Sequence, residues 1–397
     1  MISTFILDKT QRQAVEMALT SPLSIITGGP GTGKTTTVNT IINIYEDRYP
    51  EHAIHLCSPT GRAAKRLKEV TNHEASTIHR LLGYNPVLGF AFNEDCPLEG
   101  PGLLIADEAS MMDIELADSL FRAIPNNVRV VLVGDVDQLP SVGPGSVLRD
   151  LISSKVIPVS WLDLNFRQNK AGEIATWADH IKKGVQPAMV SGGEVEVITV
   201  NNPEDAVPLA VEKTKELIKS GLTKLDFLCL APIYKSSSGV NILNEKIRDA
   251  INPLPEEVKD KIGYRLADKV MVIKNNYNLG VMNGDVGLVV DITDDDILVQ
   301  FDDSAEGLVN FGEDDLGILT LAYSSTVHKS QGSEAQAVIM VMTKSHYIML
   351  QRNLFYTGIT RAKKKLILIC MKEAVKKAVD NDKIVERHSG LVRRLKG

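Results

Sequence analysis

The sequence lacks any segment that would cross a membrane. No run approaches the roughly 18 consecutive apolar residues of a transmembrane helix, and the first residues do not follow the basic, apolar, small-residue order of a secretory signal. The four cysteines are too widely spaced for a zinc cluster or a disulfide framework. We therefore expect a cytoplasmic protein with no membrane partner, in which Cys57, Cys96, Cys229 and Cys370 are buried thiols.

An excess of positive charge, frequent in nucleic-acid-binding domains, is also missing. The formal net charge is −6, but residues 291–315 hold ten acidic residues and no lysine or arginine. The rest of the chain therefore carries −6 − (−10) = +4, with basic clusters at 62–68 and 361–365. Local positive charge is enough to line a nucleic-acid channel, although each cluster taken alone also fits the solvated face of a helix.

What the sequence does contain is the run GGPGTGKT at residues 28–35, which fits the pattern G-x-x-x-x-G-K-[ST]. An apolar strand precedes it and a helical segment follows, so a Gly-rich turn without a ligand is the weaker interpretation. Backbone N–H groups of such a loop converge on phosphate oxygens. We expect Lys34 to reach the β- and γ-phosphates of ATP and Thr35 to ligate Mg²⁺. The expected nucleotide-binding residues are Gly28, Gly29, Pro30, Gly31, Thr32, Gly33, Lys34, Thr35 and Thr36.

Two further apolar runs end in polar residues suited to phosphate chemistry. The run LLIADE ends in Asp107, a candidate Mg²⁺ ligand, and Glu108, a candidate base for the attacking water. The run VVLVGDVDQLPSVGPG carries Gln138, which is placed to contact the γ-phosphate. The alternatives are a surface acidic pair and a polar loop rich in turn formers.

Strand and helix patterns alternate along most of the chain, which favours parallel sheets covered by helices. Between 264 and 317 short β-rich pieces are separated by Asn283-Gly284 and acidic turns, which indicates a small inserted β-barrel. We expect strands at 23–27, 53–58, 103–107, 129–134, 195–200, 226–231, 318–323, 337–342 and 365–370. We expect helices at 8–20, 34–48, 60–70, 75–82, 113–123, 203–219, 237–251 and 350–360.

Eight motifs occur in a fixed order between about residue 7 and residue 370: GGPGTGKTTT, SPTGRAAKRL, STIHRLLG, IADEASMMD, VGDVDQLPSVGPG, LNFRQN, STVHKSQGSE and LFYTGITRAKKKL. The set resembles superfamily 1 helicases, in particular the RecD-like branch that includes the phage Dda helicases. The resemblance implies an α/β fold of two RecA-like P-loop motor domains with parallel sheets, a small β-hairpin insertion in the first and an SH3-like β-barrel insertion in the second. The expected domains are 1–165 with a pin-like insertion at 83–97, then 166–263 together with 318–397, and the inserted barrel at 264–317.

The resemblance also assigns further residues to the ATP cleft. Gln11 matches an adenine-recognising glutamine, although a solvent-facing helix position fits it as well. Arg167 and Arg361 match the arginines that close on the triphosphate from the second motor, a role suited to a bidentate guanidinium. Phe166 would stack on adenine, or else be a core phenylalanine. Gly332 and Glu334, with Gln331, would form the cleft side of their motif.

The nucleic-acid contacts implied by the resemblance come from three motifs. In the first, backbone N–H groups at a helix start would hold a phosphate of the strand. The eight histidines show no metal-ligand spacing, so polar contacts to nucleic acid fit them better than zinc ligation. The expected contact residues are Pro59, Thr60, Gly61, Arg62, Thr77, His79, Thr326, His328, Lys329 and Ser330.

The segment 83–97, GYNPVLGFAFNEDCP, is long for a loop inside a compact domain. Turn formers and apolar residues suggest a short β-hairpin with an apolar tip, and in RecD-like helicases an insertion at this place acts as a pin where the duplex splits. The alternative is that Phe90 and Phe92 pack back onto the motor domain.

Together these features predict an ATP-dependent DNA helicase that uses ATP and Mg²⁺, moves 5′-to-3′ on single-stranded DNA and opens duplex junctions, in repair, recombination or replication. Because the chain begins close to the adenine motif, we expect a minimal, monomeric motor without the N-terminal extension of larger RecD-like proteins. RNA as the substrate and unknown protein partners stay open. One alternative is an ATPase that remodels protein–nucleic acid complexes without unwinding; another is a P-loop kinase or GTPase, which leaves the second α/β domain with Arg361 unexplained.

Overall fold

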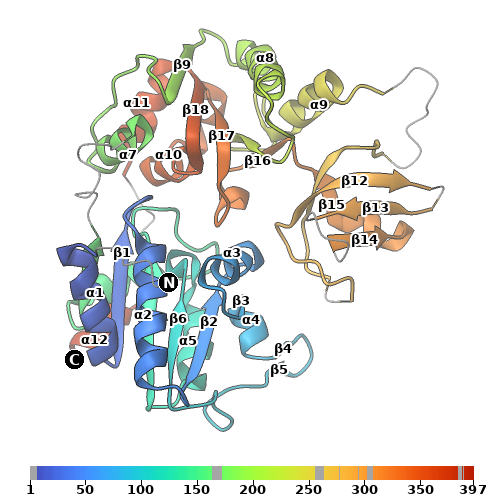
Figure 1. Cartoon of the computed structure of the whole chain (residues 1–397). Helices are drawn as coiled ribbons and strands as arrows, with labels where there is room; N and C mark the ends of the chain where they lie inside the picture. Colours follow the sequence, from blue (N-terminus) through green and yellow to red (C-terminus); the bar gives the residue numbers. More distant parts are fainter. Residues whose placement is uncertain are drawn as a thin grey trace. The chain divides into compact units, whose positions relative to one another are not determined.

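The computed structural model describes residues 7–162, 172–254, 263–276, 278–293, 295–301, 307–382, 387 and 389–397. The chain divides into two compact units (Figure 1). One comprises Met1–Ala171 together with Ile384–Gly397, and the other comprises Gly172–Lys383. In the part of the chain that the structure describes, no helix combines the length and the apolar character needed to cross a membrane. Three of the four cysteines are buried, whereas Cys96 is exposed, contrary to expectation.

The first unit is built on a six-stranded sheet in which every pairing is parallel. Successive side chains of a strand point to opposite faces, so Ile25 packs into one hydrophobic core and Ile26 into the other. Both faces are therefore covered, as parallel sheets require. In spatial order the strands are β3 (Ala75–Thr77), β2 (Ala53–Ser58), β6 (Gly102–Ala106), β7 (Val128–Gly134), β1 (Leu23–Gly28) and β8 (Val159–Leu162).

Helices cover the two faces of this sheet in two groups. One core holds side chains of α1 (Lys9–Thr20), α2 (Lys34–Arg48) and α3 (Gly61–Thr71). The other holds side chains of α4 (Ile78–Leu81), α5 (Ile114–Ala123) and α6 (Val147–Ser154), with α12 (Leu391–Lys396) packed against it. The segment 75–82, expected as one helix, is instead a short strand followed by α4, because Thr77 caps the helix only from that point. The residues of α12, expected in the second domain, pack in the first unit.

The second unit contains a five-stranded parallel sheet, as expected for a second motor domain. Its order is β16 (Ser324–Thr326), β10 (Phe227–Ala231), β17 (Ala335–Met342), β18 (Ala362–Cys370) and β9 (Val195–Thr199). The helices of this unit are α7 (Glu173–Lys182), α8 (Ala206–Lys219), α9 (Val240–Ile251), α10 (Arg352–Ile359) and α11 (Lys372–Asp380).

An antiparallel five-stranded sheet is inserted into the second unit, as the β-rich sequence predicts. In spatial order it contains β14 (Leu308–Phe311), β13 (Ile297–Gln300), β12 (Val286–Ile292), β11 (Lys269–Val272) and β15 (Leu319–Leu321). The expectation of one motor strand at 318–323 is wrong. β15 pairs with β11 in the insertion, and the motor strand β16 begins only at Ser324. The chain passes between the two sheets within this apolar stretch.

The segment 83–97 contains a small hairpin of β4 (Tyr84–Asn85) and β5 (Gly89–Phe90). Its tip carries Val87 and Leu88, which are 90% and 85% exposed. Phe90 and Phe92 instead pack against the core of the first unit. Both interpretations therefore hold for different residues: the tip is exposed and apolar, and the two phenylalanines anchor its base.

A buried carboxylate joins the inserted sheet to the second motor. Asp268, directly before β11, is fully buried and forms an ion pair with Arg248 of α9 at 2.7 Å. The same carboxylate accepts hydrogen bonds from the Tyr323 hydroxyl at 2.9 Å and the Asn252 amide at 2.8 Å. Because α9 and Tyr323 lie at the two ends of the insertion, this one side chain fixes both of its connections.

We expect Asp268→Asn to destabilise the second unit strongly. The substitution breaks the buried ion pair between Asp268 and Arg248, which costs about 3–5 kcal/mol. Urea denaturation followed by circular dichroism measures the loss. The control is Asp249→Asn, which removes a half-exposed partner of Arg265 and should cost under about 1 kcal/mol. Equal midpoints for the two variants would show that Asp268 does not hold the junction.

Candidate functional site

The phosphate loop lies between β1 and α2 and depends on two of its glycines. A Cβ at Gly28 would lie 2.7 Å from the backbone oxygen of Leu162, so no larger residue fits. Gly33 is the N-cap of α2 and has φ +85°, in the left-handed region that favours glycine. The tight turn leaves the first N–H groups of α2 unpaired within the helix, which is the arrangement that binds anions.

Lys34 lies across this loop. Its Nζ donates hydrogen bonds to the backbone oxygens of Gly28 at 2.6 Å and Gly29 at 2.9 Å. Thr35, the next residue of α2, is exposed. The loop thus presents an ammonium group and a hydroxyl from adjacent positions of one helix turn.

Gln11 connects α1 to the loop. Its side-chain oxygen accepts from the N–H of Asp8 and the Asp8 carboxylate accepts from the N–H of Gln11, which forms a capping box at the start of α1. Its Nε2 donates to the backbone oxygen of Thr32 at 3.3 Å. Gln11 is therefore not a solvent-facing helix residue: the structure brings it to the phosphate loop.

The carboxylates Asp107 and Glu108 follow β6, which is separated from β1 only by β7 in the sheet. Burial, and next the negative charge of Glu108, raise the pKa of Asp107 to about 6, while the charge of Lys34 opposes the shift. Glu108 has φ +52°, uncommon for a residue with a side chain and a cost of order 1–3 kcal/mol that is typical of functional sites. A cation bound between these groups would remove the electrostatic cost carried by Asp107.

Gln138 lies in the loop after β7, the strand between β1 and β6. Its side chain is 6% exposed, and its Nε2 donates to the carboxylate of Asp135 at 3.4 Å. Its Oε1 is buried and has no hydrogen-bond partner among the described residues. A buried amide oxygen without a protein partner is costly, so this oxygen is suited to accept a hydrogen bond from a water or a ligand.

In the second unit Arg361 follows the end of α10 and is 3% exposed. Its guanidinium donates to the backbone oxygens of Thr357 at 3.1 Å and Ser333 at 3.2 Å. Ser333 lies in the motif that contains Gly332 and Glu334, so the structure brings these two predicted motifs together. Phe166 and Arg167 lie outside the described residues.

The predicted nucleic-acid residues of the first unit lie at two helix starts. Thr60 caps α3 and Thr77 caps α4 through their hydroxyls, as Ser and Thr caps do. Pro59, Gly61 and Arg62 flank the first of these caps. The His79 ring packs edge-on against Tyr84 of the hairpin, with 5.3 Å between ring centroids, and burial lowers the pKa of His79. His79 thus supports the base of the hairpin.

In the second unit the motif at 326–330 forms a turn after β16. Thr326 and Ser330 are both buried, and the Ser330 hydroxyl donates to the backbone oxygen of Val327 at 2.8 Å. The half-buried His328 has its pKa lowered by burial. Lys329 lies over the ring of Tyr234, with 5.5 Å from Nζ to the centroid.

Tyr234 is a residue that the sequence analysis missed. It follows β10, is 40% exposed and lies beside a predicted nucleic-acid lysine. In proteins that bind single-stranded nucleic acid, exposed aromatic rings beside basic residues stack on bases. The sequence feature that could have identified it is an aromatic residue followed by Lys235, close to the end of an apolar strand.

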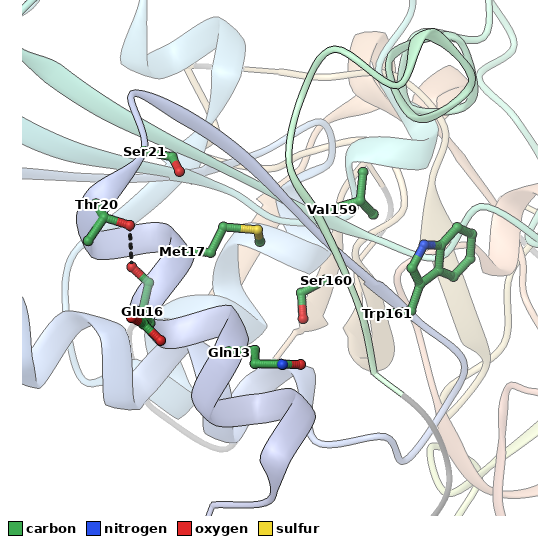
Figure 2. A pocket seen from close by; sticks show the side chains of 8 residues that line it. All are labelled: Gln13, Glu16, Met17, Thr20, Ser21, Val159, Ser160 and Trp161. Carbon is green, nitrogen blue, oxygen red and sulfur yellow. Dashed lines mark hydrogen bonds between the residues drawn. The ribbon is translucent and has the colours of Figure 1, made fainter.

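A separate surface hollow of about 590 Å³ lies between α1 and the edge strand β8 (Figure 2). Met17 and the half-exposed Trp161 line it, and the Thr20 hydroxyl donates to the backbone oxygen of Glu16 at its rim. No residue of the phosphate loop lines this hollow. It is therefore distinct from the nucleotide-binding residues.

Comparison with known families agrees with the fold of each part. Residues 11–144 match the AAA domain family, residues 321–369 match the UvrD-like helicase C-terminal domain, and residues 243–301 match the SH3 domain of ATP-dependent RecD-like DNA helicases. The last match covers much of the inserted sheet and confirms the prediction of an SH3-like insertion.

Two solved structures show the same fold at low sequence identity. A Pif1 helicase from Bacteroides, in complex with ADP-AlF3 and single-stranded DNA, is 18% identical with a TM-score of 0.56, over 91% of this chain and 92% of that one. Pif1 from Candida albicans is 17% identical with a TM-score of 0.55, over 98% of each chain.

Curated relatives are closer in sequence. The ATP-dependent RecD2 DNA helicase of Deinococcus radiodurans is 37% identical over 360 residues, which are 90% of this chain but 48% of that protein. This chain therefore spans about half the length of that relative. The RecBCD enzyme subunit RecD of Mycobacterium tuberculosis is 31% identical, over 97% of this chain and 72% of the relative. With these identities and the order of its domains, the chain belongs to the RecD-like branch of the superfamily 1 helicases, which are ATP-driven P-loop enzymes.

Proposed function

We propose that this chain is an ATP-dependent DNA helicase that moves 5′-to-3′ along single-stranded DNA and separates the strands of a duplex. The observation that carries the proposal is the set of groups at the carboxyl ends of β1, β6 and β7: Lys34, the pair Asp107 and Glu108, and the buried side-chain amide of Gln138. In a RecD-like chain these groups suit ATP hydrolysis. The direction rests on the resemblance to the RecD-like branch.

Within the site each group has a distinct proposed role. Lys34 holds the β- and γ-phosphates, Gln138 contacts the γ-phosphate, and Glu108 accepts a proton from the attacking water. Thr35 and Asp107 would hold Mg²⁺, which prefers hydroxyl and carboxylate oxygens. The raised pKa of Asp107 fits this role because a nearby cation favours its ionised form. When bound, Mg²⁺ supplies positive charge to the phosphate oxygens.

The second unit would contribute positive charge to the triphosphate and contacts to the nucleic-acid strand. Arg361, and by resemblance Arg167, would bind the triphosphate when the nucleotide is present, and such arginines are worth about 10³–10⁵ in rate in related enzymes. The helix starts at Thr60 and Thr77, together with Lys329 and Tyr234, would contact the strand. If the strand-contacting residues of the two units bind the strand tightly at different stages of the ATP cycle, the chain would move along the strand.

A strand-separation assay tests the proposal directly. Duplexes with a 5′ tail, a 3′ tail or an RNA tail are incubated with the full chain, ATP and Mg²⁺. We expect unwinding of the 5′-tailed DNA and nucleic-acid-stimulated ATP hydrolysis. ATP hydrolysis without strand separation would favour a remodelling ATPase, and a preference for the RNA tail would favour an RNA motor.

Lys34→Ala should abolish turnover but not folding. The side chain contributes two hydrogen bonds to loop oxygens and little packing, whereas loss of one preorganised charge at a reacting phosphate costs about 10²–10³ in rate. Phosphate release and circular dichroism on one preparation measure both effects. The exposed Lys9→Ala on α1 serves as the control. Turnover within a few fold of wild type, with a native spectrum, would remove Lys34 from the site.

Glu108→Gln should bind nucleotide and DNA normally but stall. The amide keeps the size of the side chain and removes the base, a loss of about 10²–10⁴ in rate. Single-turnover ATP hydrolysis and equilibrium binding of a fluorescent ATP analogue separate the two steps. Glu115→Gln, an exposed position on α5, should behave as wild type. If nucleotide affinity falls as much as turnover, Glu108 is a binding residue and the base lies elsewhere.

Replacing Val87 and Leu88 by serine should uncouple ATP hydrolysis from unwinding. The two residues form an exposed tip on a turn fixed by Asn85, whose side-chain oxygen accepts from both N–H groups, at 2.8 and 3.1 Å. An apolar tip can replace base stacking at a fork, worth about 1–3 kcal/mol per base for an aromatic contact. At about 1 kcal/mol or more, we expect unwinding to be slower by about fivefold or more, with unchanged DNA-stimulated ATPase activity.

The control for the hairpin tip is Val190→Ser, an exposed valine of the second unit. The phenylalanines at the hairpin base stay untouched, because Phe90 and Phe92 pack in the core and their loss would confuse stability with function. Wild-type unwinding by the double serine variant would show that the hairpin is not a pin.

A further inference from the structure

The last residues of the chain form a segment that is tied to the first unit. Within residues 389–397, Leu391 and Leu395 pack against the core beside α6. The Ser389 hydroxyl donates to the carboxylate of Asp150 on α6 at 2.5 Å. We call Arg387 together with residues 389–397 the C-terminal clamp. It reaches the first unit although the residues up to Asp382 belong to the second.

Arg387 is the residue of the clamp that contacts a loop of the proposed site. Its Nη1 lies 3.0 Å from the Ser141 hydroxyl, 2.6 Å from the backbone oxygen of Gly143 and 2.7 Å from that of Gly145. One guanidinium nitrogen, which carries two hydrogens, thus lies within hydrogen-bond distance of three acceptors from five consecutive residues. Ser141 is itself buried, and its hydroxyl also lies within 3.1 Å of the Gly143 oxygen.

These acceptors belong to the sensor loop, residues 135–146, which also carries Gln138. The loop has little freedom at Gly145, which has φ +86° and where a Cβ would lie 3.0 Å from Ile114. The N–H of Ile114 donates to the backbone oxygen of Pro144 at 2.9 Å. The loop is therefore packed against the start of α5 on one side and held by Arg387 at its carbonyl oxygens.

The position of Gln138 depends on how this loop is held. Its neighbour Leu139 is 2% exposed, and only Pro140 separates Leu139 from Ser141, so a shift of residues 141–145 would reach Gln138 along the backbone. A displacement of about 1 Å at a reacting phosphate can cost about 10² in rate. The Nε2 of Gln138, which donates to Asp135 in this structure, is the donor that a γ-phosphate oxygen would accept from, so its placement is at stake.

We infer that Arg387 is a positioning residue for Gln138, and that the C-terminal clamp sets the geometry of the sensor loop for hydrolysis. The inference rests on the proposed function of Gln138 as the γ-phosphate contact. It adds a requirement: the first unit needs residues from the far end of the chain to hydrolyse ATP at full rate. Arg387 contacts loop oxygens and acts on the nucleotide only through the loop.

Three variants of the full chain test the inference. Arg387→Met keeps the length of the side chain but removes every donor. Arg387→Lys returns three donors on a single nitrogen, which is what the three acceptors require. Arg394→Met, at an exposed position of α12, is the matched control.

We expect Arg387→Met to lower the DNA-stimulated kcat by about tenfold or more, with a KM for ATP within about twofold of wild type. Arg387→Lys should recover most of the rate, and Arg394→Met should equal wild type. Amide hydrogen exchange at residues 136–146 should be faster in Arg387→Met and normal in Arg387→Lys. Substitution of a residue that only stabilises the fold would lower the melting temperature, but it would not lower kcat while leaving the KM for ATP unchanged.

An unchanged kcat in Arg387→Met overturns the positioning role, as does a loss in Arg387→Lys equal to that in Arg387→Met. The lysine variant decides the matter even if the methionine variant folds poorly. If the wild-type chain shows no DNA-stimulated hydrolysis, the proposed function fails instead. Exchange in the sensor loop then still tests whether Arg387 holds it, and unchanged exchange overturns the clamp.

Discussion

The parallel pairing of β1, β6 and β7 decides where the chemistry of the first unit lies. Because all three strands run in the same direction, the loops that follow them meet at one edge of the sheet. The phosphate loop, the pair Asp107 and Glu108, and the sensor loop with Gln138 therefore converge although they are separated by many residues in sequence. The helix start at Thr60 follows β2, the next strand in the sheet, so it opens at the same edge. The rest of the site depends on this register.

That constraint explains why the sequence predicts the centre of the site well. Strands buried on both faces appear in the sequence as continuous apolar runs. Each of these three runs is followed by a motif typical of phosphate binding or hydrolysis. The phosphate loop and its flanking elements are placed within a residue or two of expectation. Prediction of strand boundaries fails where the local sequence contains no residue that marks the end of a strand. The run at 318–323 is apolar except for Thr320 and gives no sign of a boundary, and only pairing with β11 or β10 decides where one strand ends and the next begins.

Tertiary contacts decide the other differences in the same way. Nothing local to α12 indicates that Leu391 and Leu395 belong to the core of the first unit, because a helix of six residues has too short a pattern to identify its partner. Phe90 and the tip residue Leu88 are both apolar and adjacent to the same turn, yet one packs inward and the other is exposed. Pattern alone predicts a hairpin there but not which of its side chains form the surface.

Arg248 differs from Lys34 and Arg361 in the kind of partner that its side chain contacts. Arg248 is bound to the carboxylate of Asp268, and removing either partner of such a buried ion pair is strongly destabilising. Lys34 and Arg361 instead donate to neutral backbone oxygens. A phosphate oxygen is a stronger acceptor than a carbonyl, so each of these two side chains is suited to exchange a backbone oxygen for a phosphate oxygen. The sequence shows only lysine and arginine at these positions, and the folded chain separates them by giving a charged partner to one group and neutral partners to the other.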